Sequence, residues 1–255
     1  MLDKIVELVK ETKPIIFDKE KRNNITNKGY ADYVTQVDFE VQKFLNEKLA
    51  NLYPDIQFMG EEGERKDIDM KKSVWILDPI DGTANLVHNF NQSAVSLGLV
   101  VNNDPVLGVV YNPFSEEVFY AEKGKGAYLN GKEIHVTKSK TMKECIICAG
   151  TAPYYKDLAK DTADTIYRVM CASEDIRRCG SAAIDLCNVA SGRADGFFER
   201  MLKPWDYAAG IAILTEAGGK ASNYDLGSIA YDRPDNIIAS NGLIHEELRN
   251  VVVGK

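Results

Sequence analysis

The sequence has no long uninterrupted hydrophobic run, no excess of basic residues, and few cysteines and histidines. Its longest apolar stretches, such as residues 93–101 and 145–150, fall well short of the roughly 18 to 20 residues that a membrane-spanning helix needs. The 31 Lys and Arg residues against 38 Asp and Glu residues give a formal net charge of −7. This charge argues against nucleic acid as a main partner, because phosphate backbones bind to stripes of Lys and Arg. Asp3 and Glu7 stand where a signal peptide would have its basic region and apolar core, so the expected location is the cytoplasm.

The five cysteines are an odd number spread through the chain, which does not indicate the disulfide framework of a small secreted protein. Cys145 and Cys148 form a C-x-x-C pair inside an apolar run, but no second pair of Cys or His residues lies at zinc-binding spacing. We expect both to be buried thiols of a strand, with redox or metal binding as the alternative. The 45% of apolar and 27% of charged residues are typical of a globular protein with a sizeable core.

The hydrophobic pattern indicates N-terminal helices, then antiparallel strands, and then alternating strands and helices after about residue 140. It predicts one helix over the first two dozen residues, a polar loop at 23–29 and a second helix at 38–49. The predicted strands are 56–60, 74–77, 94–101, 106–111, 118–121, 127–129 and 133–136, of which the last two flank a hairpin turn at Asn130 and Gly131. A strand is predicted at 146–149, followed by helices at 157–170, 181–192 and 208–217. This order indicates two closely packed subdomains, residues 1–140 and 141–255, that form one integrated unit.

The densest cluster of unusual residues follows an apolar strand and reads Asp-Pro-Ile-Asp-Gly-Thr, residues 78–83. Two carboxylates at the end of a buried strand need a counter-charge, because unpaired buried charges are costly. No Lys or Arg occurs between Lys72 and Lys123, so either a bound cation or a distant basic residue must supply it. Carboxylate oxygens suit a hard cation such as Mg²⁺, and the backbone N–H groups of Gly82 and Thr83 suit a phosphate. The alternative is an Asp-rich surface turn without a ligand.

Two further acidic sites support a metal centre. Glu61 lies in a Gly-Glu-Glu-Gly loop that follows a short predicted strand, and Asp206 lies where a late helix is predicted to begin. Asp206 could instead serve only as the N-cap of that helix, a role that contributes about 1 kcal/mol to helix stability. Both roles can coexist.

Taken together, these motifs resemble the inositol monophosphatase family of Mg²⁺-dependent, lithium-sensitive phosphatases. The resemblance covers nearly the whole chain and rests on segments in the same order: residues 32–38, 60–62, 75–88, 180–183, and 204–210 with 216–219. It implies an α/β (α+β) fold, namely a layered αβαβα sandwich with an antiparallel N-terminal sheet and a mixed C-terminal sheet. It also implies a homodimer that hydrolyses a small-molecule phosphate ester without forming a phosphoenzyme.

The resemblance further implies two to three Mg²⁺ ions per site. One ion would be held by Glu61, Asp78 and the backbone carbonyl of Ile80, a second by Asp78, Asp81 and Asp206, and a weaker third by Glu61 and water. Thr83 and Glu61 would orient the attacking water, whose pKa metal coordination lowers, and Asp38 would lie near them. The residues implied to contact the substrate are Asp81, Gly82, Thr83, Gly180, Ser181, Ala182 and Glu199, and Lys28 lies on a loop that can close over the metals.

Several substrates remain open. Inositol 1-phosphate is favoured, and fructose 1,6-bisphosphate and nucleotide or NADP phosphates are the alternatives within the family. Arg177, Arg178 or Arg200 could bind a second phosphate, although a solvated surface charge is the more frequent role of an Arg. His88 is expected to be structural, because no second His lies at ligand spacing. A non-enzymatic alternative is a regulatory relative associated with RNA polymerase or ribosomes, which the intact set of acidic residues argues against.

Overall fold

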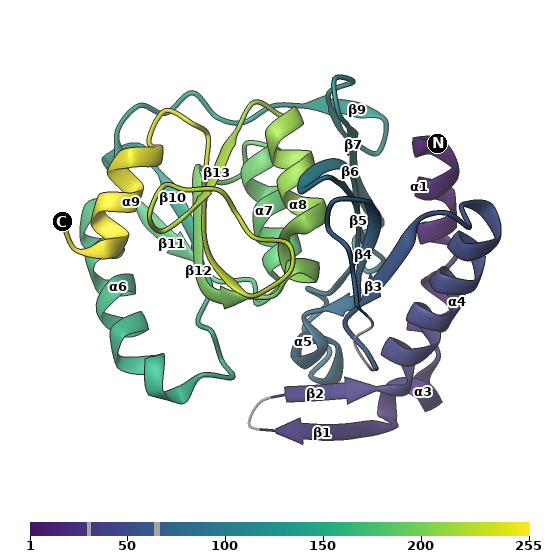
Figure 1. Ribbon diagram of the computed structural model, residues 1–255. Coiled ribbons are helices and arrows are strands. Elements are labelled where there is room, and N and C mark those ends of the chain that lie inside the picture. The colour runs from purple at the N-terminus through teal and green to yellow at the C-terminus, as the bar shows by residue number, and fades with distance from the viewer. Residues whose placement is uncertain (30–31, 64–66) are drawn as a thin grey trace.

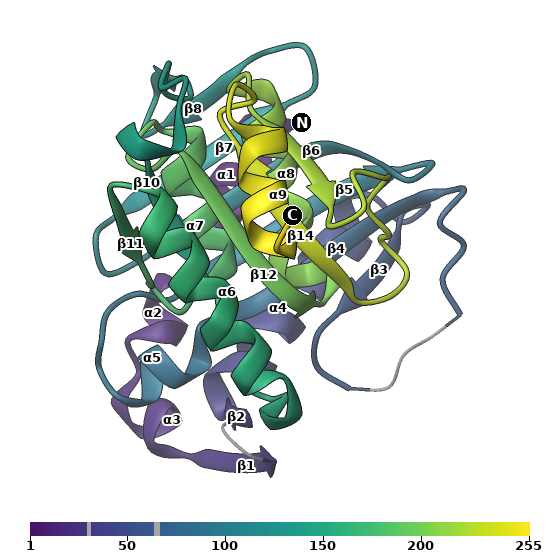
Figure 2. The same ribbon diagram turned by 90° about the vertical axis from the view of Figure 1, so that its left-hand side faces the viewer.

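The computed structural model describes residues 1–29, 32–63 and 67–255, and they fold into five alternating layers of helices and sheets (Figures 1 and 2). From right to left in Figure 1 these are a helical layer, a seven-stranded sheet, a second helical layer, a five-stranded sheet and a third helical layer. The main helices of the three layers are α1 (Leu2–Lys10) and α4 (Gln36–Leu52), then α7 (Ala182–Ala190) and α8 (Pro204–Glu216), then α6 (Ala159–Ala172) and α9 (His245–Val253). The αβαβα sandwich that the family resemblance implied is confirmed.

The first sheet contains, in spatial order, β3 (Gln57–Gly60), β4 (Ser73–Asp81), β5 (Ala94–Val101), β6 (Asp104–Asn112), β7 (Glu117–Glu122), β8 (Ala127–Leu129) and β9 (Lys132–Ile134). Neighbouring strands from β4 to β9 are antiparallel, but the edge strand β3 is parallel to β4. The predicted antiparallel sheet is thus antiparallel from β4 to β9, and the parallel pair at this edge was not predicted. The segment between β3 and β4 is long enough for the chain to cross back before β4 begins, which parallel pairing requires.

Two tight hairpins of this sheet follow directly from local sequence. Asn130 and Gly131 have φ angles of 49° and 83°, and Asn102 and Asn103 have φ angles of 52° and 61°. Positive φ at both central residues is the geometry of the turn that matches the twist of a hairpin, and Asn and Gly tolerate it best. The predicted hairpin at 130–131 is thereby confirmed.

The second sheet contains, in spatial order, β11 (Asp175–Arg177), β10 (Ile146–Ala149), β12 (Gly196–Leu202), β14 (Asp235–Ser240) and β13 (Lys220–Asn223). β10 is parallel to β11 and β12, whereas β14 is antiparallel to β12 and β13, so the predicted mixed sheet is confirmed. The first sheet lies within residues 57–134 and the second within 146–240. The boundary of the subdomains near residue 140 stays our interpretation of this arrangement.

The N-terminal region differs from its prediction in two places. The single predicted helix is three short ones, α1, α2 (Lys13–Ile16) and α3 (Lys19–Asn23), because Pro14 is tolerated only at a helix start and Asp18 caps α3. The predicted loop at 23–29 is instead strand β1 (Ile25–Gly29), which pairs antiparallel with β2 (Asp32–Thr35) as a separate hairpin at the bottom of Figure 1. The remaining short helices are α5 (Thr83–Val87) and two 3₁₀ turns, Met142–Glu144 and Lys156–Leu158.

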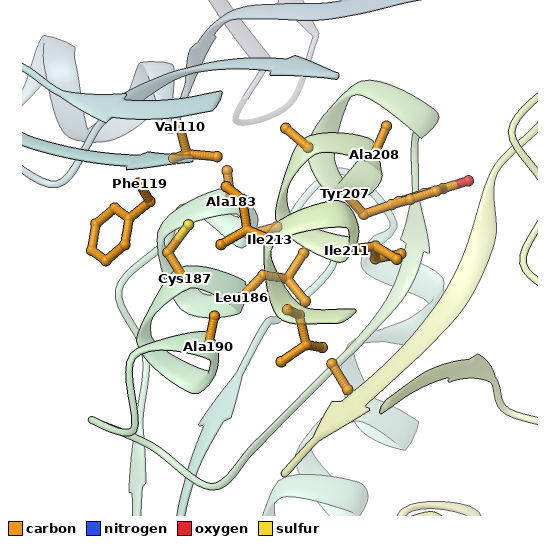
Figure 3. Close-up of a cluster of buried hydrophobic side chains, with 14 of the residues drawn as sticks. Val110, Phe119, Ala183, Leu186, Cys187, Ala190, Tyr207, Ala208, Ile211 and Ile213 are labelled. Carbon is orange, nitrogen blue, oxygen red and sulfur yellow. The ribbon is translucent and has the colours of Figure 1, made fainter. Parts of the chain in front are cut away.

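The hydrophobic core lies between the layers. The central cluster fills the space between the two sheets, where Val110 and Phe119 of the first sheet face side chains of α7 such as Cys187 (Figure 3). A Cβ atom on Gly108 of β6 would lie 2.3 Å from the carbonyl oxygen of Ala209, so this glycine permits α8 to pack directly on the sheet. The core therefore fixes α7 and α8 against the end of β4, where the acidic motif lies.

The buried thiols agree with expectation, since Cys148 lies in β10, Cys145 precedes it, and both are buried and free. Within the part of the chain that the structure describes, no helix has both the length and the apolar character needed to cross a membrane.

Candidate metal and phosphate site

Three carboxylates from distant parts of the chain meet at the end of β4. Asp78 and Asp81 lie in β4, and Asp206 lies in the first turn of α8. One carboxylate oxygen of each lies within 4.8 Å of the others. Asp78 and Asp81 are only 3% and 8% exposed, and Asp206 is half-buried. The structure thus brings together three of the predicted metal-ligating residues.

Burial raises the pKa of each of these three groups, and repulsion from neighbouring carboxylates adds to the rise for Asp78 and Asp206. For Asp78, burial acts together with the charges of Glu61, Asp81 and Asp206, and it lifts the pKa well above 3.8. For Asp206, burial and the charges of Asp81 and Glu61 have the same effect. Burial also raises the pKa of Asp81, but hydrogen bonds from Ser181 and from the backbone of α7 limit the rise to about 6. A cluster of carboxylates that repel one another in a buried setting, with only oxygen donors, fits a hard divalent cation such as Mg²⁺.

Asp206 is not the N-cap of α8, which corrects one of the two predicted roles. The helix begins at Pro204, four residues earlier than predicted, and Lys203 is its N-cap. The backbone N–H of Lys203 donates to Oδ2 of Asp206 at 2.7 Å, and the carbonyl of Lys203 accepts from the N–H of Asp206 at 3.0 Å. This reciprocal pair holds the Asp206 carboxylate against the start of the helix.

Glu61 is delivered to the same place by the parallel pairing of β3 with β4. Its N–H donates to the carbonyl of Leu77 at 3.1 Å, which extends the ladder by one residue, and the charge of its carboxylate raises the pKa of Asp78. The next residue, Glu62, is fixed by Gln42 of α4, whose side-chain amide exchanges two hydrogen bonds with the Glu62 backbone, at 2.6 and 3.0 Å. Sequence reasoning missed Gln42, because a neutral amide on a helix gives no signal of its distant partner.

Thr83 and Asp38 are also brought together. The Thr83 hydroxyl lies 3.1 Å from Oδ1 of Asp38 and 3.0 Å from the carbonyl oxygen of Ile80. Asp38 is fully buried in the first turn of α4, where its Oδ2 accepts from the N–H and the hydroxyl of Thr35 at 2.9 and 2.6 Å. Burial raises the pKa of Asp38 to about 6, although the Thr35 hydrogen bonds oppose this rise. The Thr83 hydroxyl is therefore held between two acceptors and keeps a lone pair that can accept from a water molecule.

Asn85 links the segment after β4 to the turn before α7. The sequence motif gave this residue no role. Its amide donates to the carbonyls of Gln92 at 2.6 Å and Cys179 at 2.9 Å, with the carbonyl of Gly180 at 3.3 Å. Gly82 and Gly180 have φ angles of 86° and 81°, and a Cβ on Gly82 would lie 3.1 Å from the Gly180 carbonyl. The predicted substrate residues Gly82 and Gly180 thus lie against each other, backbone to backbone.

Glu199 of β12 lies near the three carboxylates, since its charge raises the pKa of Asp206. Burial raises its pKa to about 7, and the charges of Asp185 and Asp81 act in the same direction. Its carboxylate accepts from the N–H of Ala152 at 3.0 Å, and Ala152 has a strained φ angle of 43°. A Cβ on Gly150 would lie 1.9 Å from the Glu199 carboxyl carbon, so only glycine fits there.

The basic residues near the predicted substrate wall differ in where they lie. Arg178 donates to the Thr151 hydroxyl at 3.1 Å, and its charge lowers the pKa of Glu199. Arg177 pairs with Asp175 at the surface, and Arg200 lies over the ring of Tyr224 at 5.7 Å. Of these three, Arg178 therefore faces the site. Lys28 lies in β1, but its side chain is outside the described part of the chain, and exposed His88 meets the edge of the Tyr33 ring.

Comparison with known proteins shows which family this chain resembles in sequence and structure. Residues 1–254 match the model of the inositol monophosphatase family. The chain is 39% identical over 231 residues to a Thermotoga maritima protein named fructose-1,6-bisphosphatase/inositol-1-monophosphatase, covering 90% of this chain and 86% of that protein. It is 38% identical over 238 residues to a Haemophilus influenzae protein named Nus factor SuhB, covering 91% and 88%. The solved structure of the Thermotoga maritima IMPase is similar with a TM-score of 0.89 at 36% identity, covering 99% of this chain and 96% of that one.

Proposed function

Because this chain belongs to the inositol monophosphatase family, whose members hydrolyse phosphate monoesters, we propose that it is a Mg²⁺-dependent phosphatase that acts on inositol 1-phosphate. The observation that carries the proposal is the convergence of Asp78, Asp81 and Asp206, with Glu61 beside them. The homodimer and the location in the cytoplasm stay predictions.

We propose that the site holds two to three Mg²⁺ ions. Glu61, Asp78 and the Ile80 carbonyl would hold one ion. Asp78, Asp81 and Asp206 would hold a second, and Glu61 with water would hold a weaker third. The chemistry supplied by bound Mg²⁺ is a lower pKa of coordinated water and a spreading of the charge that develops on the attacking and leaving oxygens.

The residues of the chain orient the reactants. Thr83, held by Asp38 and the Ile80 carbonyl, accepts a hydrogen bond from the attacking water with a lone pair of its hydroxyl. Glu61 accepts a second hydrogen bond from the same water. The N–H groups of Gly82 and Thr83 hold the phosphate, and the Glu199 carboxyl hydrogen-bonds the substrate hydroxyls while Ala152 fixes its orientation. Gly180, Ser181 and Ala182 form the facing wall.

The test is phosphate release by the purified protein with and without Mg²⁺. The substrates are inositol 1-phosphate, fructose 1,6-bisphosphate, adenosine 3′,5′-bisphosphate, NADP⁺ and histidinol phosphate, each repeated with Li⁺. Mg²⁺-dependent turnover of inositol 1-phosphate that Li⁺ inhibits supports the proposal. Absence of turnover with every ester would overturn it and favour a regulatory role, as the name of the Haemophilus influenzae relative suggests.

Fructose 1,6-bisphosphate is a second candidate, supported by Arg178 beside Glu199 and by the name of the Thermotoga maritima relative. We expect Arg178→Ala to lower kcat/KM for fructose 1,6-bisphosphate at least about tenfold more than for inositol 1-phosphate, since a hydrogen bond to a charged group contributes about 1.5–3 kcal/mol. Arg177→Ala is the matched control, because Arg177 pairs with Asp175 at the surface. Equal losses on both substrates would exclude a second-phosphate contact by Arg178.

A further inference from the structure

The hydroxyl of Ser181 lies between α7 and the metal ligands and contacts both. As the N-cap of α7 it accepts from the N–H of Ile184 at 3.3 Å, and it donates to Oδ2 of Asp81 at 2.6 Å. Ser181 and Asp81 are 2% and 8% exposed, so water competes little for these bonds. Because the Ile184 N–H already points at the hydroxyl oxygen, the hydroxyl's own proton is directed to Asp81.

The same carboxylate oxygen receives a second donor from α7. The N–H of Ala183 donates to Oδ2 of Asp81 at 2.7 Å. Two short hydrogen bonds from the start of α7 therefore fix the orientation of the Asp81 carboxylate.

The turn that carries Ser181 is itself fastened to the metal-binding half. Asn85 of α5, four residues after Asp81, donates to the carbonyl of Cys179, two residues before Ser181. The Gly180 carbonyl lies within reach of the same amide at 3.3 Å. Asp81 and Asn85 therefore bond to the Cys179–Ala183 turn from two sides, so the position of Ser181 relative to Asp81 is set by two independent contacts.

We propose that Ser181 is a positioning residue that aligns the Asp81 carboxylate for the metal ion through its hydroxyl, and that Asn85 holds the turn on which Ser181 stands. This inference rests on the metal site of the proposed function. The resemblance to the family assigned Ser181 to the substrate wall, but its hydroxyl proton is committed to Asp81 and is not available to donate to a substrate.

The test is direct binding of Mn²⁺ without substrate, measured by the loss of the EPR signal of free Mn²⁺. We expect Ser181→Ala to weaken Mn²⁺ binding about 10-fold to 100-fold, the usual effect of removing a hydrogen bond to a metal ligand. Ser181→Thr keeps both the cap and the hydroxyl and should restore binding. The matched control is Ser191→Ala, at the other end of α7, where the hydroxyl donates to the Cys187 carbonyl at 2.8 Å, and it should leave binding unchanged.

The variant Ser181→Gly distinguishes the positioning of Asp81 by the hydroxyl from a purely structural role of Ser181 as the N-cap of α7. Glycine is a tolerated N-cap that costs only a few tenths of a kcal/mol relative to serine, so this variant keeps the fold while it lacks the hydroxyl. It should bind Mn²⁺ as weakly as Ser181→Ala. Asn85→Ala should weaken Mn²⁺ binding in the same direction.

The inference would be overturned if the Kd of Ser181→Gly for Mn²⁺ were within about twofold of the wild-type value. Such a change is far below the effect expected for losing a hydrogen bond to a metal ligand. The proposed function would still stand if phosphate release depended on Mg²⁺. Conversely, a wild-type protein that binds Mn²⁺ but releases no phosphate would overturn the proposed function, while a weakened Ser181→Gly variant would still support the role of Ser181. A wild-type protein that binds no Mn²⁺ would overturn both.

Discussion

Replacing Asp81 by Asn should make the metal-free protein more stable and the enzyme inactive. Asp81 is buried next to Asp78 and Asp206, so its charge is unfavourable unless a cation is bound. Asn has nearly the same shape and no charge, and its amide oxygen can still accept from the Ser181 hydroxyl and the Ala183 N–H. The substitution therefore removes repulsion in the empty site and removes a ligand from the loaded one.

The magnitude follows from the pKa of Asp81, which burial raises from 3.8 to about 6. A folded-state pKa above the unfolded value means that the folded chain binds the proton more tightly. The ionised group therefore costs stability above the folded pKa, and this cost disappears as the pH falls below the unfolded value. A shift of about 2 units at about 1.36 kcal/mol each predicts a cost of about 3 kcal/mol at neutral pH. We expect metal-free Asp81→Asn to exceed the wild type in unfolding free energy by about 2–3 kcal/mol.

The assay is urea unfolding at neutral pH, first with EDTA and then with Mg²⁺. Wild-type protein should gain about 2.7 kcal/mol when Mg²⁺ is about 100-fold above its Kd, and the variant should gain much less. Asp104→Asn is a control at an exposed ion pair with Lys123, and it should change stability by less than about 0.5 kcal/mol. Our assignment of Asp81 to the metal would be refuted by a variant that is less stable than the wild type in EDTA, or by one that keeps Mg²⁺-dependent phosphate release.

Three further predictions concern single residues. His245 is buried between two serine hydroxyls, and burial lowers its pKa to about 4. About 3 kcal/mol of the unfolding free energy should therefore be lost as the pH falls from 6.5 towards 4. Urea unfolding of His245→Gln should not show this loss. Gly108→Ala would place a methyl group 2.3 Å from the Ala209 carbonyl and should lower the unfolding free energy by about 1–3 kcal/mol in urea. Gly150→Ala should displace the Glu199 carboxyl, raising KM for inositol 1-phosphate in steady-state kinetics while the far-UV circular dichroism stays unchanged.

The parts of the fold that sequence could predict are those with a local physical cause. The hairpin at Asn130 and Gly131 follows from the positive φ angles that these residues tolerate, and it was predicted correctly. The parallel pairing of β3 with β4 was not predicted, because strand direction depends on the path of the connecting segment rather than on the strand's own residues. The N-terminal helix was predicted as one element because its apolar spacing continues past Pro14, where the backbone of a helix cannot.

In the candidate site, the charged residues could be found from sequence and the neutral ones could not. Asp78 and Asp81 could be found from sequence because two carboxylates at the end of a buried strand need a counter-charge. Asp206 was noticed because it stands where a late helix was predicted to begin. Asn85 could not be given a role from sequence, because the carbonyl of Cys179 that it donates to lies 94 residues away. A neutral amide also occurs in many loops without any specific function. The structure places the three carboxylates together, whereas their role as metal ligands and the role of each site residue in catalysis stay predictions for the experiments above.

The spacing of the acidic residues depends on the hydrophobic core more than on the acidic motif. Asp81 is bonded to the start of α7, and Asp206 stands in the first turn of α8. These two helices pack so closely that a Cβ on Gly210 would lie 2.6 Å from a methyl carbon of Leu186, in the apolar layer between the sheets (Figure 3). A change of side-chain volume in that layer shifts one helix against the other, and with it one carboxylate against the other, although no residue of the site is altered. A close-packed core between the sheets therefore holds the repelling carboxylates at a distance that a cation can bridge.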